Sequence, residues 1–232
     1  MQQEPEQDAW KRMAGEEAVN YIEPGMVIGI GTGSTAAYMV RALAQRMRDG
    51  LTITGAVPTS QATSQLAASL GIPLTSLDDH PELDLAIDGA DEIDPRLFLI
   101  KGAGGALLRE KIVATASHRF IVIGDSTKLV SKLGSTAPVP VETVPFGAAT
   151  VHRSLEKLGA RVELRQRDGK TFLTDNSNVI LDCCFANGID DPTILDLLIR
   201  AIVGVVETGL FLRMAERAII GGANGIQVML QR

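Results

Sequence analysis

The sequence predicts an α/β protein in which a mostly parallel open sheet with flanking helices carries an inserted ferredoxin-like α+β lobe. In the first half of the chain, short apolar runs alternate with stretches of helical periodicity, the pattern of βαβ units. From about Ala137 the order changes to strand–helix–strand–strand–helix–strand, which is that of a ferredoxin-like lobe. We therefore expect a Rossmann-like catalytic domain over residues 1–136 and 209–232, and the lobe over residues 137–208.

The elements of the first domain follow from periodicity and turn signals. Apolar residues at helical spacing between Trp10 and Ile22 predict a helix that ends before Pro24-Gly25, and a second helix covers Met39 to Met47. The remaining elements are strands at 26–30, 51–57, 72–77, 83–88 and 119–125, and helices at 60–70 and after Gly104-Gly105.

The lobe is expected to begin with a strand at 138–146 and a helix at 147–158. Strands at 161–166 and 178–184, a helix at 192–200 and a strand around Val205 complete it. Residues 208–230 are expected to return to the first sheet.

Composition and charge exclude several classes of protein. Of the 232 residues, 45% are hydrophobic and 22% are charged, which suits a folded globular chain. The net charge of −6 argues against nucleic-acid and membrane partners, because both reward basic patches. No apolar run is long enough to span a bilayer, and the N-terminus lacks a signal-peptide core, so we expect a cytoplasmic enzyme.

The cysteines and histidines indicate neither a zinc site nor a covalent nucleophile. Cys183 and Cys184 are adjacent and are expected to form a buried, reduced pair. His80, His118 and His152 are scattered without ligand spacing, and no nucleophile–base pair is evident.

A glycine-rich loop, Gly29 to Thr35, lies between a predicted strand and a predicted helix. Its glycines allow a close backbone approach, and the helix N–H groups and hydroxyls beside them favour an anion. The loop is neither a P-loop nor a clean G-x-G-x-x-G, and a capped tight turn is the structural alternative. Lys128, after the strand at 119–125, is either a second phosphate contact or a surface lysine.

Three acids, Asp88, Asp91 and Glu92, follow the apolar run at 83–87. Ligands of open α/β sheets bind at the carboxyl ends of strands, so these acids lie where chemistry normally occurs. Closely spaced carboxylates also suit Mg²⁺, and an Asp-rich turn is the structural alternative.

Lys101 follows the apolar run at 97–100, which predicts an ammonium group at the end of a buried segment. There it can offset carboxylates or stabilise an oxyanion. Glu110 lies on the next predicted helix with only alanine and valine as neighbours one turn away. This face desolvates the carboxylate and makes it a usable base, whereas a solvated helix residue is the alternative.

Four segments that carry these groups occur in order along the chain: GIGTGSTA (29–36), DGADEID (88–94), KGAGGALLREKIV (101–113) and IGDSTKLV (123–130). Together they resemble ribose-5-phosphate isomerase type A, and the resemblance covers nearly the whole chain. It implies interconversion of D-ribose 5-phosphate and D-ribulose 5-phosphate in the non-oxidative pentose phosphate pathway. It also implies that no metal or cofactor takes part and that the protein is a homodimer or homotetramer.

The resemblance further implies a role for each matched residue. Glu110 matches the catalytic base, and Lys128 matches a substrate-binding lysine. The other matched residues form the substrate loop, the acidic segment and the lysine–glycine segment: Thr32, Gly33, Ser34 and Thr35; Asp88, Gly89, Ala90 and Asp91; Lys101, Gly102, Ala103 and Gly104. Ala103 stands where some members have glycine.

The residues and the resemblance agree on an enediolate mechanism. Glu110 is expected to move the proton between C2 and C1, and Lys101 to stabilise the enediolate oxygen. Asp88 or Asp91 would move hydroxyl protons and assist ring opening.

Two rival functions remain. A sugar-phosphate-sensing regulator would need a DNA-binding segment, which residues 1–25 do not resemble. A nucleotide-dependent oxidoreductase would need an acid about 20 residues after its glycine motif, where the chain has an apparent turn at 48–50.

Overall fold

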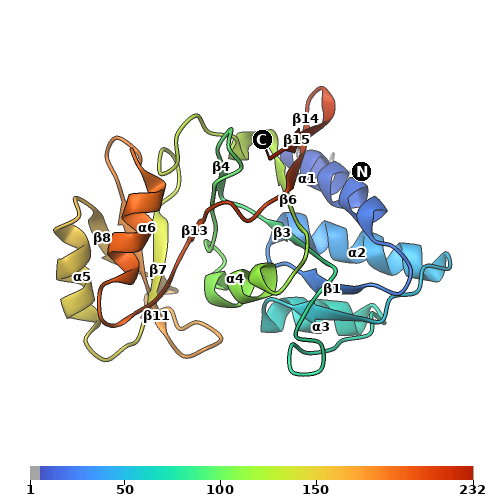
Figure 1. Cartoon of the computed structure of the whole chain (residues 1–232), viewed down its shortest axis with the longest axis horizontal. Helices are drawn as coiled ribbons and strands as arrows, with labels where there is room; N and C mark the ends of the chain where they lie inside the picture. Colours follow the sequence, from blue (N-terminus) through green and yellow to red (C-terminus); the bar gives the residue numbers. More distant parts are fainter. Residues whose placement is uncertain (1–5, 232) are drawn as a thin grey trace. The chain divides into compact units, whose positions relative to one another are not determined.

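The computed structural model describes residues 6–231 and divides into two compact units (Figure 1). The first unit contains the chain up to Ala90, then Arg109–Lys128, and the chain from Met214 onward. The second unit contains Asp91–Leu108 and Leu129–Arg213. The chain therefore passes between the units within the segment that holds the candidate acids and Lys101.

The first unit is built on a six-stranded sheet in the order β15-β14-β6-β3-β1-β2. All neighbours pair in parallel except the edge strand β15, which pairs with β14 antiparallel. Nearly continuous burial along the inner strands fits a parallel sheet that is covered on both faces. The strands are β1 (Val27–Ile30), β2 (Gly55–Pro58), β3 (Leu85–Gly89), β6 (Phe120–Asp125), β14 (Arg217–Gly222) and β15 (Gly225–Leu230).

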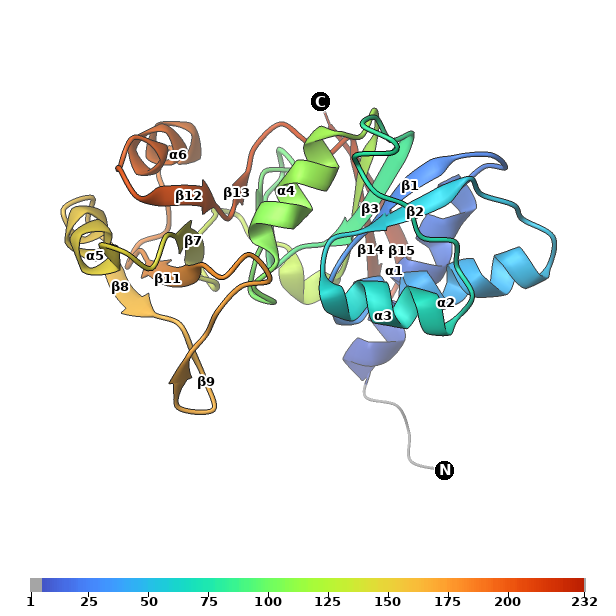
Figure 2. The ribbon, with the colours of Figure 1, turned by 90° about the horizontal axis from the view of Figure 1, so that it is seen from below.

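Helices α1 (Glu6–Ala18), α2 (Ser34–Arg48) and α3 (Gln61–Ser69) share one core with the strands. A 3₁₀ turn, Val19–Tyr21, follows α1, and Figure 2 shows α2 and α3 side by side. Helix α4 (Leu107–Thr115) packs on the strands through Val113, which lies where a side chain at Gly29 would project.

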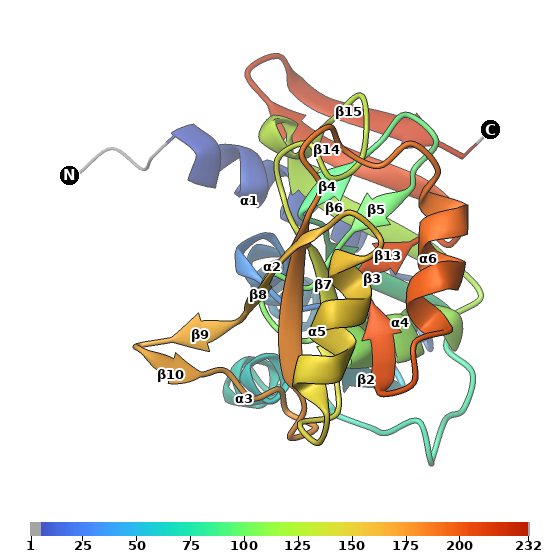
Figure 3. The ribbon, with the colours of Figure 1, turned by 90° about the vertical axis from the view of Figure 1, so that its left-hand side faces the viewer.

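The second unit contains a four-stranded antiparallel sheet in the order β12-β7-β11-β8. Helices α5 (Ala148–Glu156) and α6 (Pro192–Arg200) pack on the face formed by alternate residues such as Val141 and Leu181 (Figure 3). The strands are β7 (Val139–Thr143), β8 (Arg161–Leu164), β11 (Val179–Cys184) and β12 (Val205–Thr208). With α5 after β7 and α6 after β11, this is the βαββαβ arrangement that the sequence predicts.

Short strands complete the second unit. A three-stranded sheet has the order β13-β5-β4, and a hairpin pairs β9 with β10. These five strands are β4 (Glu92–Ile93), β5 (Leu99–Ile100), β9 (Gln166–Arg167), β10 (Lys170–Thr171) and β13 (Leu210–Phe211).

The predicted fold class is confirmed, and the structure differs from the prediction in detail. The strand expected at 51–57 begins only at Gly55, and the one at 72–77 is reduced to a bridge between Ala56 and Leu74. Residues 91–108 group with the second unit because β5 pairs with β13 rather than with the large sheet. Two-residue strands are too short to produce the alternation from which strands are recognised.

The two cysteines are successive residues of β11, so their side chains point to opposite faces of the sheet. Cys183 is fully buried, and burial, followed by the nearby Asp182 and Cys184, raises the pKa of its thiol to about 12. Cys184 is half-buried. The expected buried pair is therefore correct for Cys183 alone.

We predict that iodoacetamide at about pH 8 modifies Cys184 in the native protein and leaves Cys183 untouched, because the thiolate is the reactive form. Fragment mass spectra of the peptide that contains both residues measure the two sites separately. The unfolded protein is the control and should be labelled at both. Labelling of native Cys183 would contradict the prediction.

Candidate active site

The candidate residues are distributed over both units. Those of the first unit are the glycine-loop residues 32–35, the acidic segment 88–90, Glu110 and Lys128. Those of the second unit are Asp91 and the lysine–glycine segment 101–104. The candidates of the first unit thus include two carboxylates and one lysine, and those of the second unit include one carboxylate and one lysine.

The Asp88 carboxylate organises the glycine-rich loop of the first unit. Asp88 lies near the end of β3 and is 3% exposed. Its Oδ1 accepts hydrogen bonds from the N–H groups of Thr32 (2.9 Å) and Gly89 (2.7 Å). A Cβ at Gly31 would lie only 2.6 Å from Asp88 Cα, so a larger residue does not fit without displacing backbone.

The Thr32 hydroxyl belongs to a cluster of hydroxyl groups. Thr32 Oγ1 lies 2.7 Å from Thr59 Oγ1, 2.8 Å from Ser60 Oγ and 3.1 Å from Thr63 Oγ1. Thr63 in turn donates to the carbonyl oxygen of Gly31 (3.0 Å). The side chain of Thr32 therefore anchors the loop to β2 and α3. Sequence reasoning missed this cluster, whose only signal was the run of hydroxyl residues after β2.

The exposed part of the loop is the start of α2. Gly33, the N-cap residue, has a φ of 118° and is exposed, as is Ser34, the first residue of the helix. N–H groups in the first turn of a helix favour an anion. A cavity of about 360 Å³ borders residues 31–34 and is otherwise lined by α2 and α3.

Glu110 lies in the first turn of α4 and is only 4% exposed. The small apolar face predicted for it agrees with this burial, and the alternative of a solvated helix residue is wrong. Its neighbour Arg109 is half-buried and lines a second cavity of about 370 Å³ with Ser60, Gln61 and Ser64. Sequence reasoning assigned Arg109 no role.

Lys128 ends a 3₁₀ turn, Ser126–Lys128, directly after β6, and is half-buried. The turn is shaped by Asp125, a fully buried residue whose Oδ1 accepts from the N–H (3.0 Å) and hydroxyl (2.5 Å) of Thr127. Gln7 of α1 also donates to Thr127 (3.3 Å). The sequence analysis gave Asp125 and Gln7 no role, because no motif near either residue indicates its hydrogen bond to Thr127.

In the second unit, Lys101 is 2% exposed, and its ammonium nitrogen lies 5.3 Å from the centroid of the Phe211 ring. The backbone N–H of Lys101 donates to the carbonyl oxygen of Gly209 (2.9 Å). The loop that follows begins with Gly102 at a φ of 107°, and the N–H of Ala103 donates to Asp91 Oδ2 (2.8 Å). Lys101 is thus a buried cation at the end of a strand, as predicted.

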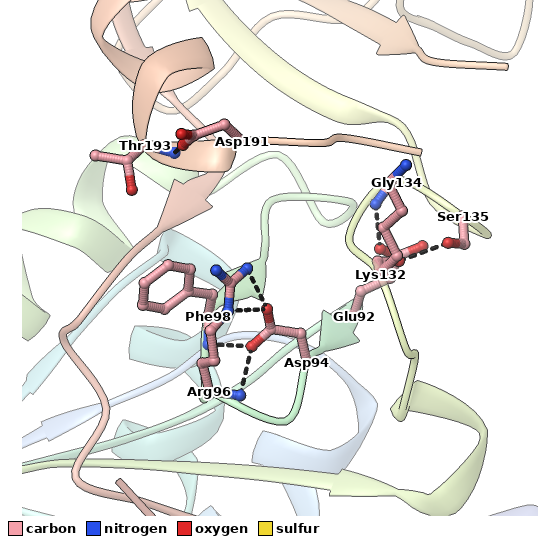
Figure 4. Close-up of polar contacts among 9 residues, drawn as sticks. All are labelled: Glu92, Asp94, Arg96, Phe98, Lys132, Gly134, Ser135, Asp191 and Thr193. Carbon is pink, nitrogen blue, oxygen red and sulfur yellow. Dashed lines mark hydrogen bonds and ion pairs between the residues drawn. The ribbon is translucent and has the colours of Figure 1, made fainter. Parts of the chain in front are cut away.

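The other two acids of the DGADEID segment have structural partners (Figure 4). Glu92 is fully buried and accepts hydrogen bonds from Gly134, Thr136 and Ala137. Asp94 accepts hydrogen bonds from the backbone N–H groups of Arg96 and Phe98 and forms an ion pair with the Arg96 side chain. The interpretation of Glu92 as part of an acidic site therefore needs correction, since its hydrogen bonds are all with the loop at 134–137.

Within residues 6–231, no three or more His, Cys, Asp or Glu side chains are grouped so that they could hold a metal ion. None of the helices in the same range is long and apolar enough to cross a membrane.

A family model and two similar sequences all point to one family. A family model for ribose 5-phosphate isomerase A (phosphoriboisomerase A) matches residues 55–225. The ribose-5-phosphate isomerase A of Roseiflexus castenholzii is 54% identical over 219 residues, covering 94% of this chain and 93% of the relative. That of Parvibaculum lavamentivorans is 50% identical over 229 residues, covering 96% and 98%.

Solved structures of the same name have the same fold. A D-ribose-5-phosphate isomerase in complex with phospho-erythronic acid has a TM-score of 0.93 at 40% identity, covering 97% of this chain and 99% of its own. The ribose 5-phosphate isomerase from Plasmodium falciparum has a TM-score of 0.94 at 39% identity, with the same coverage.

We predict that Gly31→Ala destabilises the protein by about 1–3 kcal/mol, because the added methyl group overlaps the backbone and carboxylate of Asp88. Urea unfolding followed by circular dichroism measures the change. Gly222→Ala is the matched control, since its methyl group would meet Ser126 only at an ordinary 3.4 Å. Equal stability of the two variants would contradict the close approach of Gly31 to Asp88.

Proposed function

The chain belongs to the ribose 5-phosphate isomerase A family, and on this premise we propose a role for each group of the candidate site. The protein is an aldose–ketose isomerase that interconverts D-ribose 5-phosphate and D-ribulose 5-phosphate. The observation that carries the roles proposed below is the burial of Asp88, Lys101 and Glu110, all within 23 residues of sequence.

The reaction moves a proton between two adjacent carbons through an enediolate. It requires a base for the carbon-bound proton, positive charge or hydrogen-bond donors for the developing oxyanion, and a grip on the phosphate. Opening of the sugar ring requires movement of a hydroxyl proton as well.

We propose that Glu110 is the base that transfers the carbon-bound proton. A carboxylate that is 4% exposed has lost most of its hydration, which strengthens it as a base toward a weakly acidic C–H group. Arg109 and Lys111 flank Glu110 in the sequence, and side chains one position apart on a helix do not face each other.

We propose that Lys101 and backbone N–H groups of the lysine–glycine loop stabilise the negative charge on the enediolate oxygen. A buried ammonium group acts in a low dielectric, where it stabilises negative charge far more than it does in water. Its position near the Phe211 ring supports a fixed orientation.

Asp88 and Asp91 are proposed to move the hydroxyl protons and to assist ring opening. Each has one oxygen hydrogen-bonded to backbone N–H groups, Asp88 to Thr32 and Gly89 and Asp91 to Ala103. These bonds orient both carboxylates.

The phosphate is proposed to bind at the start of α2, through N–H groups of residues 33–35 and the hydroxyls of Ser34 and Thr35. Because the Thr32 hydroxyl is engaged by Thr59, Ser60 and Thr63, we assign Thr32 to shaping the loop. Lys128 would supply a cation to the phosphate or the sugar. Gly89, Ala90 and residues 102–104 would contact the sugar through their backbone.

We propose that the reaction uses neither a metal nor a cofactor. The Mg²⁺ alternative for the acidic segment loses support because Glu92 is occupied by the loop at 134–137. We further propose that the enzyme acts in the cytoplasm, in the non-oxidative pentose phosphate pathway.

We propose a homodimer or homotetramer, in which a second copy covers an apolar patch of the second unit. Phe146 and Val203 are each 95% exposed, and Val144 and Val206 are partly exposed beside them in sequence. The N–H of Val144 donates to the carbonyl oxygen of Gly204 (3.0 Å), which brings the two loops together. Fully exposed large apolar side chains of this kind mark contact surfaces.

We predict that Glu110→Gln lowers kcat by about 10²–10⁴-fold, because the amide keeps the shape of the side chain but cannot accept the proton. A coupled assay of ribose 5-phosphate conversion in excess EDTA measures it, with Glu156→Gln on α5 as the control. Near-wild-type kcat in Glu110→Gln would refute the base assignment. Loss of wild-type activity in EDTA would return Asp88 and Asp91 to metal binding.

We predict that the double variant Phe146→Ser, Val203→Ser has a lower mass in solution than the wild type, because each substitution removes apolar area from the contact. Size-exclusion chromatography with light scattering measures the mass. Leu173→Ser, at another exposed apolar residue of the same unit, is the control. A wild-type monomer, or an unchanged assembly in the double variant, would contradict the proposed contact.

A further inference from the structure

The loop at 101–105, which carries Lys101, has a sequence that does not fix its own conformation. Three of its five residues are glycine, and two of these, Gly102 and Gly105, have φ values of 107° and 89°. Glycine gives the backbone wide freedom, so peptide planes beside it rotate easily. A loop that stabilises a developing charge needs the opposite property, because its donors must be oriented before the reaction starts.

Arg165, between β8 and β9, supplies a direct restraint on this loop. Its Nη1 donates to the carbonyl oxygens of Gly102 (2.7 Å) and Ala103 (3.1 Å). Its Nε and Nη2 donate to the two carboxylate oxygens of Asp182 (2.8 and 2.5 Å). The side chains of Arg165 and Asp182 are 12% and 19% exposed, so solvent screens the pair little.

One peptide group of the loop is held at both ends by charged side chains. The carbonyl oxygen of Gly102 accepts from Arg165, and the N–H of Ala103 donates to Asp91 Oδ2 (2.8 Å). These two atoms belong to the same planar peptide unit. Fixing both ends therefore fixes the rotation of the whole plane, and with it the backbone that follows Lys101.

Rotation of this plane by half a turn would have two effects on the proposed chemistry. It would exchange the positions of a carbonyl oxygen and an N–H group, so that a face of the loop that presents a donor would present an acceptor. It would also remove the hydrogen bond that orients Asp91. The first change disfavours a developing negative charge, and the second leaves unoriented an acid that is assigned to the hydroxyl protons.

We propose that Arg165, anchored by Asp182, is a positioning residue for the isomerase reaction: it holds the Gly102–Ala103 peptide in the orientation that turnover requires. The inference rests on the role proposed above for the lysine–glycine loop. Arg165 contacts backbone rather than substrate, so its contribution belongs to the chemical step. Its charge is offset by Asp182, so it orients the peptide without making the loop an additional anion site.

Arg165 differs in its contacts from two arginines that are close to it in the sequence. Arg161, on β8, pairs with Glu163 at the surface, and both side chains are more than half exposed. Arg167 lies with its guanidinium carbon 4.5 Å from the centroid of the Phe172 ring. Arg161 therefore serves as a control of equal charge, four residues before Arg165 in the sequence.

We predict that Arg165→Met lowers kcat for ribose 5-phosphate by about 10–100-fold with little change in KM, since a small misplacement of catalytic groups has effects of this size. Arg165→Lys should remain impaired, because an ammonium group cannot bind both Asp182 oxygens and the carbonyls as a fork does. Arg161→Met should behave as wild type. Added guanidinium ion at non-denaturing concentration should partly restore kcat in Arg165→Ala and not in Arg161→Ala.

Backbone amide hydrogen exchange of residues 101–105 supplies a measurement that does not depend on activity. Exchange at Ala103 should accelerate in Arg165→Met by more than exchange at core amides of β11, which reports any loss of global stability. If Arg165→Met turns over normally, or if its loss lies wholly in KM, the positioning role is wrong. If the wild type does not isomerise ribose 5-phosphate yet Ala103 exchange accelerates in the variant, the proposed function fails and the restraint on the loop stands.

Discussion

The candidate site of the first unit depends on the close approach of β1 and β3 at their carboxyl ends. The parallel register places Ile30 opposite Ile87, so the next residues, Gly31 and Asp88, meet where the strands end. Because Gly31 has no side chain, the Asp88 carboxylate reaches the backbone of Thr32. One steric condition therefore joins an acid to the loop that begins α2, and every role proposed for that loop depends on it.

In the second unit, too, a carboxylate helps to hold a glycine-containing loop, but it acts through an arginine side chain. In β11, Leu181 and Cys183 point into the core shared with α5 and α6, so the alternation of the strand turns Asp182 to the other face. There it anchors Arg165, which holds the backbone at Gly102. The ferredoxin-like sheet thus uses its helix-covered face for stability and its opposite face to restrain a flexible loop.

Long, strongly patterned elements could be predicted from the sequence, whereas contacts between distant segments could not. The helix predicted at 192–200 is α6, and the structure shows that Asp191 caps it and Pro192 begins it. Asp88, Asp91 and Glu92 are alike in sequence, yet only the fold shows that Glu92 binds the loop at 134–137. Arg165 looked like an ordinary charged residue of a strand, since its partners lie 17 and 63 residues away. The boundary near residue 91 was missed because it depends on two-residue strands.

Burial of charge is common to a structural acid and to the catalytic candidates. Glu92 is fully buried, and the hydrogen bonds it accepts from one loop account for its presence, because they close that loop. Lys101 and Glu110 are buried to a similar degree, Lys101 before a glycine-rich loop and Glu110 in the first turn of α4. Buried ion pairs are often replaceable by apolar residues without loss of stability, so burial of a charged group is by itself weak evidence for a stabilising role. In the proposed enediolate reaction, Glu110 serves as a desolvated base and Lys101 as a cation in a low dielectric.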